Sequence, residues 1–218
     1  MSPLGGGHPL CNNRIKMEKI SIAIETRVSL SVVELALRSV LDGSATPAYF
    51  LELASSGCTG ANRAKKSVSL LNRLTVRNKL LPYLKKNETE GMLASKLDRP
   101  LLMAALMCAA YPIFYDTVTL LGKYFHAQEE VGRTLLQPKL CEKYGSNRAL
   151  FKAYNCVMPM LIETGLIKRT APGVYVMQRQ EKHSDAAAAV YKKAFLLNNP
   201  NYGENDEVEH NPYFEFIR

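Results

Sequence analysis

The side chains best suited to chemistry in this sequence are Asn, Arg and Lys residues near position 150. Asn147, Arg148 and Lys152 fall within the first turn and a half of an expected helix. Arg and Asn can form paired hydrogen bonds with the edges of guanine and adenine. Two further basic residues lie on the strand expected after this helix, where phosphate contact is the expected role: Lys168 and Arg169. This pattern favours nucleic-acid contact over a merely solvated helix face.

A second basic group lies on an earlier expected helix, residues 60–74. Its basic face, opposite the apolar stripe, carries Arg63, Lys65, Lys66 and Arg73. For these four residues, nucleic-acid contact and an ordinary solvated face both stay open, since helix surfaces are commonly rich in Lys and Arg.

The charge of the chain is unevenly distributed. Residues 60–100 sum to +7, residues 133–182 to +6 and residues 199–218 to −4, within a total of +8. Lys and Arg in the two positive blocks could neutralise phosphates and release counterions, which predicts salt-sensitive binding.

Sequence signals of catalysis are missing. There is no GxGxxG, P-loop, HExxH or GxSxG motif, and the four histidines are isolated in sequence. The adjacent pair Glu129–Glu130 is expected in a solvated turn, because neighbouring residues do not face each other on a helix. The five cysteines show neither CxxC nor zinc spacing, which favours reduced thiols in a cytoplasmic protein. We therefore predict no enzyme activity, no cofactor and no metal.

Length and composition indicate a globular protein of one or two domains, with 218 residues, 47% hydrophobic and 22% charged. The longest apolar run, residues 101–111, is about half of the ~20 residues that span a bilayer. A membrane partner is therefore not expected.

Helical patterns dominate the sequence. Helices are expected over residues 29–41, 46–56, 60–74, 78–85, 134–144, 147–164 and 186–197, with residues 87–91 as a connection. Residues 97–128 predict two helices separated at Tyr111–Pro112, because the residue before proline disfavours helix. Residues 166–170 and 174–178, around the turn 171–173, predict a β-hairpin. The expected fold is therefore mainly α, a helical bundle with a winged-helix element (helix-turn-helix plus β-hairpin) near the C-terminus.

Four regions follow from this pattern. They are a flexible segment (1–28), a helical domain with a basic helix (29–128), a winged-helix element (129–180), and a C-terminal helix with an acidic tail (181–218). The tail is expected either to be flexible or to dock through Tyr213, Phe214, Phe216 and Ile217. A further hypothesis is that it folds over a basic face and competes with DNA.

Three stretches resemble the BrxA family of bacteriophage-exclusion (BREX) systems. They are CTGANRAKKSVSLLNRL (58–74), DRPLLMAALMCAAYPIFYDTVTLLGKYF (98–125) and NRALFKAYNCVMPMLIETGLIKR (147–169), and the resemblance covers residues 46–177. It implies a non-enzymatic, mostly helical protein with winged-helix-like elements that binds double-stranded DNA within a bacterial defence system. The basic residues at matching positions are Arg63, Lys65, Lys66, Arg148, Lys152, Lys168 and Arg169.

The function predicted from these observations is non-enzymatic binding of duplex DNA, with most of the affinity supplied by phosphate contacts. Other defence-system proteins are expected as further partners, and the sequence is compatible with a homo-oligomer. Two alternatives stay open. One is a protein-interaction subunit that docks through the apolar central helices and the aromatic tail. The other is a helical RNA-binding protein.

Overall fold

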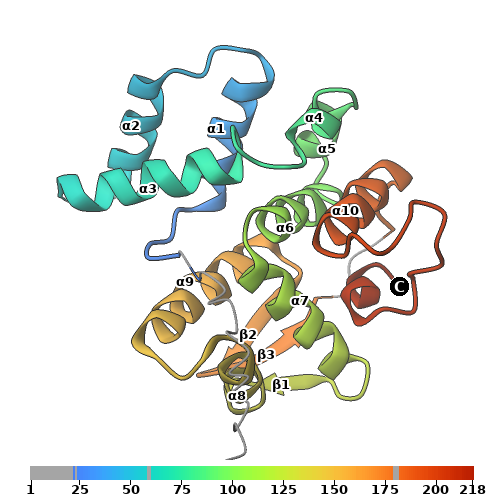
Figure 1. Cartoon of the computed structure of the whole chain (residues 1–218). Coiled ribbons are helices and arrows are strands. Elements are labelled where there is room, and N and C mark those ends of the chain that lie inside the picture. Colours follow the sequence, from blue (N-terminus) through green and yellow to red (C-terminus); the bar gives the residue numbers. More distant parts are fainter. Residues whose placement is uncertain (1–21, 23, 58–59, 179–181) are drawn as a thin grey trace, which may run out of the picture.

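The computed structural model describes residues 22, 24–57, 60–178 and 182–218. Within them the protein is mainly helical, with one small three-stranded antiparallel sheet (Figure 1). The first five helices are α1 (Leu30–Leu41), α2 (Pro47–Ser56), α3 (Ala61–Leu74), α4 (Leu81–Leu84) and α5 (Thr89–Ala94). Among the described residues, no helix has the length and apolar character that crossing a membrane requires.

A local sequence signal explains the start of α2, whereas tertiary packing determines α5. Helix α2 begins where predicted, because the Thr46 side chain accepts a hydrogen bond from the Tyr49 N–H and Pro47 fits the first helical position. Residues 87–91 were predicted as a connection, and that prediction is wrong for residues 89–91, which belong to α5. The Thr89 hydroxyl donates to the Leu84 carbonyl, and Met92 is buried, so tertiary packing turns this polar stretch into a short helix.

The centre of the core is the helix pair α6 (Arg99–Ala110) and α7 (Pro112–Phe125). Nearly every side chain of α6 is buried, and its most extensive helix contact is with α10 (Asp185–Asn198). The two central helices separate at Tyr111–Pro112, as predicted. The apolar run therefore lies inside the protein.

The chain from α7 to residue 177 forms a helix–strand–helix–helix–hairpin unit. After α7 come β1 (Glu130–Gly132), α8 (Arg133–Tyr144), α9 (Arg148–Thr164), β2 (Ile167–Ala171) and β3 (Val174–Met177). The sheet order is β1-β3-β2, with both pairs antiparallel, and Val131 lies opposite Tyr175. The predicted hairpin is thus confirmed.

Strand β1 corrects part of the expectation that Glu129–Glu130 lies in a solvated turn, because Glu129 is exposed at a bend but Glu130 belongs to the strand. Glu130 begins the strand with an exposed side chain, and the next residue, Val131, is fully buried. The strand is three residues long and its partner lies more than forty residues later, so no local pattern marks it.

The C-terminal residues are packed against the protein, which settles the choice between a flexible and a docked tail. The 3₁₀ helix η1 (Pro212–Ile217) buries Tyr213, Phe214 and Phe216, and the Tyr213 ring stacks on Tyr191 with 4.2 Å between centroids. Its backbone passes so close to α7 that a Cβ on Gly122 would overlap the Pro212 carbonyl oxygen.

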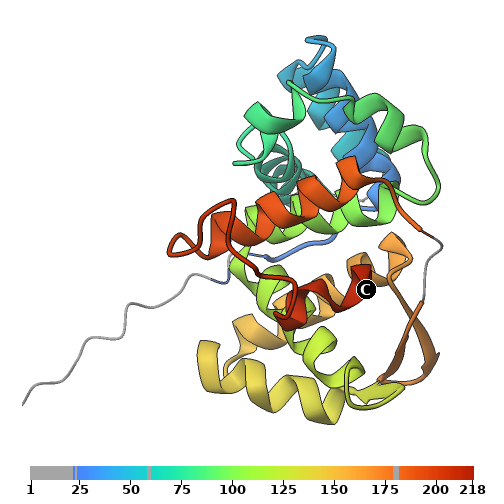
Figure 2. The ribbon, with the colours of Figure 1, turned by 90° about the vertical axis from the view of Figure 1, so that its right-hand side faces the viewer.

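Two acidic residues of the tail form ion pairs with lysines on α10. Glu204 lies 2.6 Å from Lys193 Nζ, and Glu209 lies 3.3 Å from Lys192 Nζ. Figures 1 and 2 show this segment (red) beside α7 and α10, away from α3 and α9. The tail therefore does not cover the basic residues of α3 and α9.

Residues 24–29 form an extended segment, here called the strap, that crosses between α3 and α9 (Figure 1). Its side chains alternate, with Ile24, Thr26 and Val28 buried and the residues between them exposed. This part of the segment expected to be flexible is in fact packed on the core. Residues 1–21 and 23 lie outside the described residues.

The strap runs alongside α9 in the same direction. Lys152, in the second turn of α9, lies near Glu25, and Glu163, in the last turn, accepts a hydrogen bond of 2.8 Å from the Leu30 N–H. These α9 residues are about 16 Å apart along the helix axis, and five extended residues also span about 16 Å. The strap therefore follows one flank of α9 for three helical turns.

Candidate nucleic-acid interface

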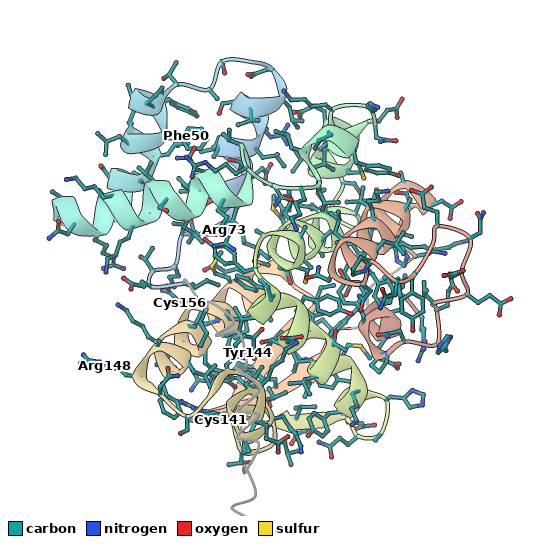
Figure 3. All side chains as sticks on the ribbon, viewed as in Figure 1. Phe50, Arg73, Cys141, Tyr144, Arg148 and Cys156 are labelled. Atoms are coloured by element: carbon teal, nitrogen blue, oxygen red, sulfur yellow. The ribbon has the colours of Figure 1, made fainter. Side chains whose placement is uncertain are left out.

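A hollow of about 460 Å³, here called the basic hollow, opens between the strap, α3 and α9. Figure 3 shows Cys156 at this junction, while Arg148 projects outward from the start of α9. The lining residues come from three parts of the chain far apart in sequence: Glu25, Thr26, Arg27, Asn62, Arg63, Lys66, Lys152, Asn155 and Cys156. The fold thus joins the two basic blocks of the sequence on one surface.

The lining carries four cations, Arg27, Arg63, Lys66 and Lys152, against one acid, Glu25. The Glu25 carboxylate lies between two of these cations. Its Oε2 atom accepts a hydrogen bond from Lys66 Nζ and lies 3.9 Å from Lys152 Nζ. The Lys66 hydrogen bond and charge, with a smaller effect of Lys152, hold the pKa of Glu25 below its usual range. Glu25 is therefore ionised at neutral pH.

The thiol of Cys156 forms part of the wall of the hollow. Burial raises the pKa of Cys156, and the positive charges of Lys152, Arg27 and Arg63 oppose that rise. A thiol that stays protonated at neutral pH is a poor nucleophile. The nearby cations create a positive electrostatic potential in the hollow, which favours an anion there.

The structure brings three of the predicted site residues together: Arg63, Lys66 and Lys152. Arg148 and Lys65 are exposed on the same two helices but do not line the hollow. All five lie on α3 and α9, the two helices that border the hollow.

Two predicted site residues have structural contacts instead. The Arg73 guanidinium lies 4.2 Å from the centroid of the Tyr111 ring, and its Nε donates to the Ala110 carbonyl at 3.0 Å. Asn147 is the N-cap of α9, where its side chain accepts from the Leu150 N–H and donates to the Tyr144 carbonyl. These bonds engage both side chains in holding the helices in place.

The remaining predicted residues, Lys168 and Arg169, are exposed on β2, an edge strand of the sheet. Neither lines the basic hollow, and Arg169 Nε donates to the Ala171 carbonyl at 3.2 Å. The hairpin tip packs against the start of α8, where the Arg133 N–H donates to the Gly173 carbonyl. The hairpin thus offers a separate, smaller basic surface.

Six lining residues were missed by reasoning from the sequence: Glu25, Thr26, Arg27, Asn62, Asn155 and Cys156. A partial signal for the first three was present, because every second residue from Ile20 to Leu30 is apolar except Thr26, which is typical of a half-buried extended segment. Asn155 lies three residues after Lys152 and so shares its helix face. Only the fold places Asn62 beside them.

Among the described residues, no group of three or more His, Cys, Asp or Glu side chains is arranged to hold a metal ion. Comparison of the chain with family models, with curated proteins and with solved structures finds no match. The geometry and charge of this surface are therefore the features that bear on function.

Proposed function

We propose that this protein binds duplex DNA without catalysing a reaction, through a winged-helix unit and the basic hollow beside it. The convergence of Arg27, Arg63, Lys66 and Lys152 from three elements onto one concave surface carries the proposal. Backbone phosphates supply most of the affinity in such interfaces, and Lys and Arg are the side chains that receive them.

The element order supports the winged-helix part of the proposal. Helix, strand, two helices and a hairpin, with β1 pairing to β3, is the order found in winged-helix domains, whose second helix of the helix-turn-helix enters the major groove. In this chain that helix is α9, and its exposed N-terminal half carries Arg148, Lys152 and Asn155. Arg and Asn are the types that read guanine and adenine edges.

The resemblance of residues 46–177 to the BrxA family agrees with this proposal. On that basis we propose that the protein acts in a bacterial phage-defence system, together with other proteins of that system. The alternative of a protein-docking subunit relied on the central helices and the aromatic tail. The side chains of α6, Tyr213 and Phe214 are already buried within the chain, so that alternative has less support.

Titration of a labelled duplex at rising salt concentrations tests the proposal. We expect affinity to fall steeply with salt, and the charge reversals Arg63→Glu and Lys152→Glu to weaken binding by at least tenfold each. Lys86→Glu is the matched control, because Lys86 is exposed in the turn between α4 and α5, away from the hollow (Figure 1). No binding even at low salt, or equal losses for all three variants, would contradict the proposal. A structured RNA that outcompetes the duplex would favour RNA as the ligand.

A further inference from the structure

Two lysines in the basic hollow share a single oxygen atom as their partner. Lys66 and Lys152 come from different helices, and the ammonium group of each forms an ion pair with Oε2 of Glu25. Two ammonium groups that converge on one oxygen atom repel each other, and an anion between them offsets that repulsion. The two lysines therefore converge on one anion position in the hollow, which Glu25 fills from the strap.

We propose that this position is a phosphate-binding subsite, and that a DNA backbone phosphate displaces the Glu25 carboxylate from it. This inference rests on the proposed DNA binding, because DNA is the source of phosphate that we favour. On this view, Glu25 holds the two lysines in place in the free protein and competes with DNA for them.

A phosphodiester can take the place of the Glu25 carboxylate because the two groups have similar charge and similar acceptor atoms. A phosphodiester carries one negative charge and two free oxygens, as a carboxylate does, so the same ammonium groups can receive it. The guanidinium groups of Arg27 and Arg63 and the amides of Asn62 and Asn155 line the same hollow and add donors suited to phosphate oxygens. Glu25 itself has only the two lysines as its ion-pair partners among the described residues.

Displacing Glu25 costs little. Its side chain is 54% exposed, and exposed ion pairs of this kind contribute little to stability. The burial of Ile24 and Thr26 on either side fixes the strap backbone, so the carboxylate can rotate into solvent without moving the chain. A phosphate that also contacts Arg27 and Arg63 should therefore bind the two lysines more tightly than the Glu25 carboxylate does.

The variant Glu25→Gln removes the competing charge and keeps the size of the side chain. Removing one negative charge within a few ångströms of a bound phosphate should raise affinity about five- to tenfold at low salt. The gain should shrink as salt screens the charges. Glu204→Gln is a matched control, because Glu204 also pairs with a lysine, Lys193, at an exposed site on α10 and the tail.

The experiment measures the binding of a labelled duplex and, separately, of inorganic pyrophosphate to the wild type and both variants. Circular dichroism confirms that each variant is folded. Tighter binding of both probes by Glu25→Gln, with Glu204→Gln unchanged, supports the inference. Unchanged or weaker binding of both probes by Glu25→Gln overturns it.

Mixed outcomes separate this inference from the proposed function. Duplex binding that is strong and equal in the wild type and Glu25→Gln overturns the inference and leaves DNA binding intact. Failure of every form to bind duplex, with pyrophosphate bound more tightly by Glu25→Gln, supports the phosphate subsite. It also shows that the phosphate comes from a source other than DNA.

Discussion

Two arginines on α3 show how residues of the same type can have different roles. Arg63 lines the basic hollow, whereas Arg73, less than three turns later, lies over the Tyr111 ring and donates to the Ala110 carbonyl. The sequence pattern placed both on one basic face. The position of the α6–α7 junction, which only the fold determines, distinguishes them.

Replacing Arg73 with alanine should therefore affect stability and leave DNA binding unchanged. Loss of the stacking contact and of a charged hydrogen bond should lower the free energy of unfolding by about 1–3 kcal/mol. Urea denaturation measures this change, and duplex titration under conditions where the variant is folded measures affinity. Arg63→Ala should weaken DNA binding and leave the free energy of unfolding unchanged. A stable Arg73→Ala variant with weakened DNA binding would assign Arg73 to the interface.

Buried tyrosines make the protein sensitive to alkaline pH. Burial raises the pKa of Tyr111 to about 12, although the Arg73 charge opposes the rise, whereas a tyrosine in the unfolded chain ionises near pH 10. Between about pH 10 and 12 the folded chain holds a proton that the unfolded chain has lost, so stability must fall as pH rises through this window.

Thermal denaturation at a series of pH values tests this linkage. The melting temperature of the wild type should fall above about pH 10. Tyr111→Phe keeps the ring under Arg73 and removes the ionisable hydroxyl, so its decline should be shallower. Identical declines in the two proteins would show that Tyr111 does not contribute.

At the scale of elements, the contact of η1 with α7 depends on one residue without a side chain. The backbone at Pro212 occupies the space that a Cβ on Gly122 would need. Gly122→Ala should therefore force η1 away from α7 and cost about 1–3 kcal/mol, as overpacking does elsewhere. Denaturant unfolding and the near-UV signal of the stacked pair Tyr191–Tyr213 report the change.

Gly91→Ala is the control for this substitution. Gly91 lies within α5, and a Cβ there meets nothing within 4 Å. Alanine favours helix over glycine by up to about 1 kcal/mol, so this variant should be as stable as the wild type or more stable. Equal stability of Gly122→Ala and the wild type would mean that the tail is held more loosely than its packing indicates.

The elements that sequence reasoning predicted correctly are those with local signals. Helices α2 and α9 have cap residues, α6 and α7 are divided by Pro112, and the hairpin β2–β3 surrounds a Pro-Gly turn. The predictions failed where distant residues determine the structure. Strand β1 depends on its pairing with β3. The sequence left open whether the tail is flexible or docked, because that choice depends on α7 and α10, which bury the aromatic residues of η1.

Contacts between distant residues also explain why only part of the candidate site was predicted from the sequence. Basic residues on α3 and α9 were found from composition and spacing, but the strap was not connected to them. Glu25 and Arg27 reach the hollow because the strap follows α9, a relation between segments more than a hundred residues apart. Sequence spacing alone does not contain that information.

At the scale of the whole molecule, charge is divided between two sides. The cations of the basic hollow have one acid among them, while the acidic tail is paired with Lys192 and Lys193 on α10. The net charge of +8 therefore understates the positive potential at α3 and α9. The tail contributes to the core rather than masking the proposed interface.

Truncation after Asn198 should consequently impair folding. Tyr213, Phe214 and Phe216 are almost fully buried, and losing three such side chains should cost about 5–9 kcal/mol. That is comparable to the total stability of a typical domain, about 5–15 kcal/mol. We expect the truncated chain to be insoluble or to lack a cooperative thermal transition. A cooperatively folded truncated protein would contradict this assignment of the tail.

The course of the strap along α9 also has a consequence during synthesis. The hydrogen bond between Leu30 and Glu163 joins residues 133 positions apart. The strap can therefore pack against α9 only after α9 has left the ribosome. Domains form from their N-terminal end as translation proceeds, and contacts this distant in sequence form late. The surface that we propose for DNA is therefore absent until α9 has left the ribosome, and a shorter nascent chain lacks this binding surface.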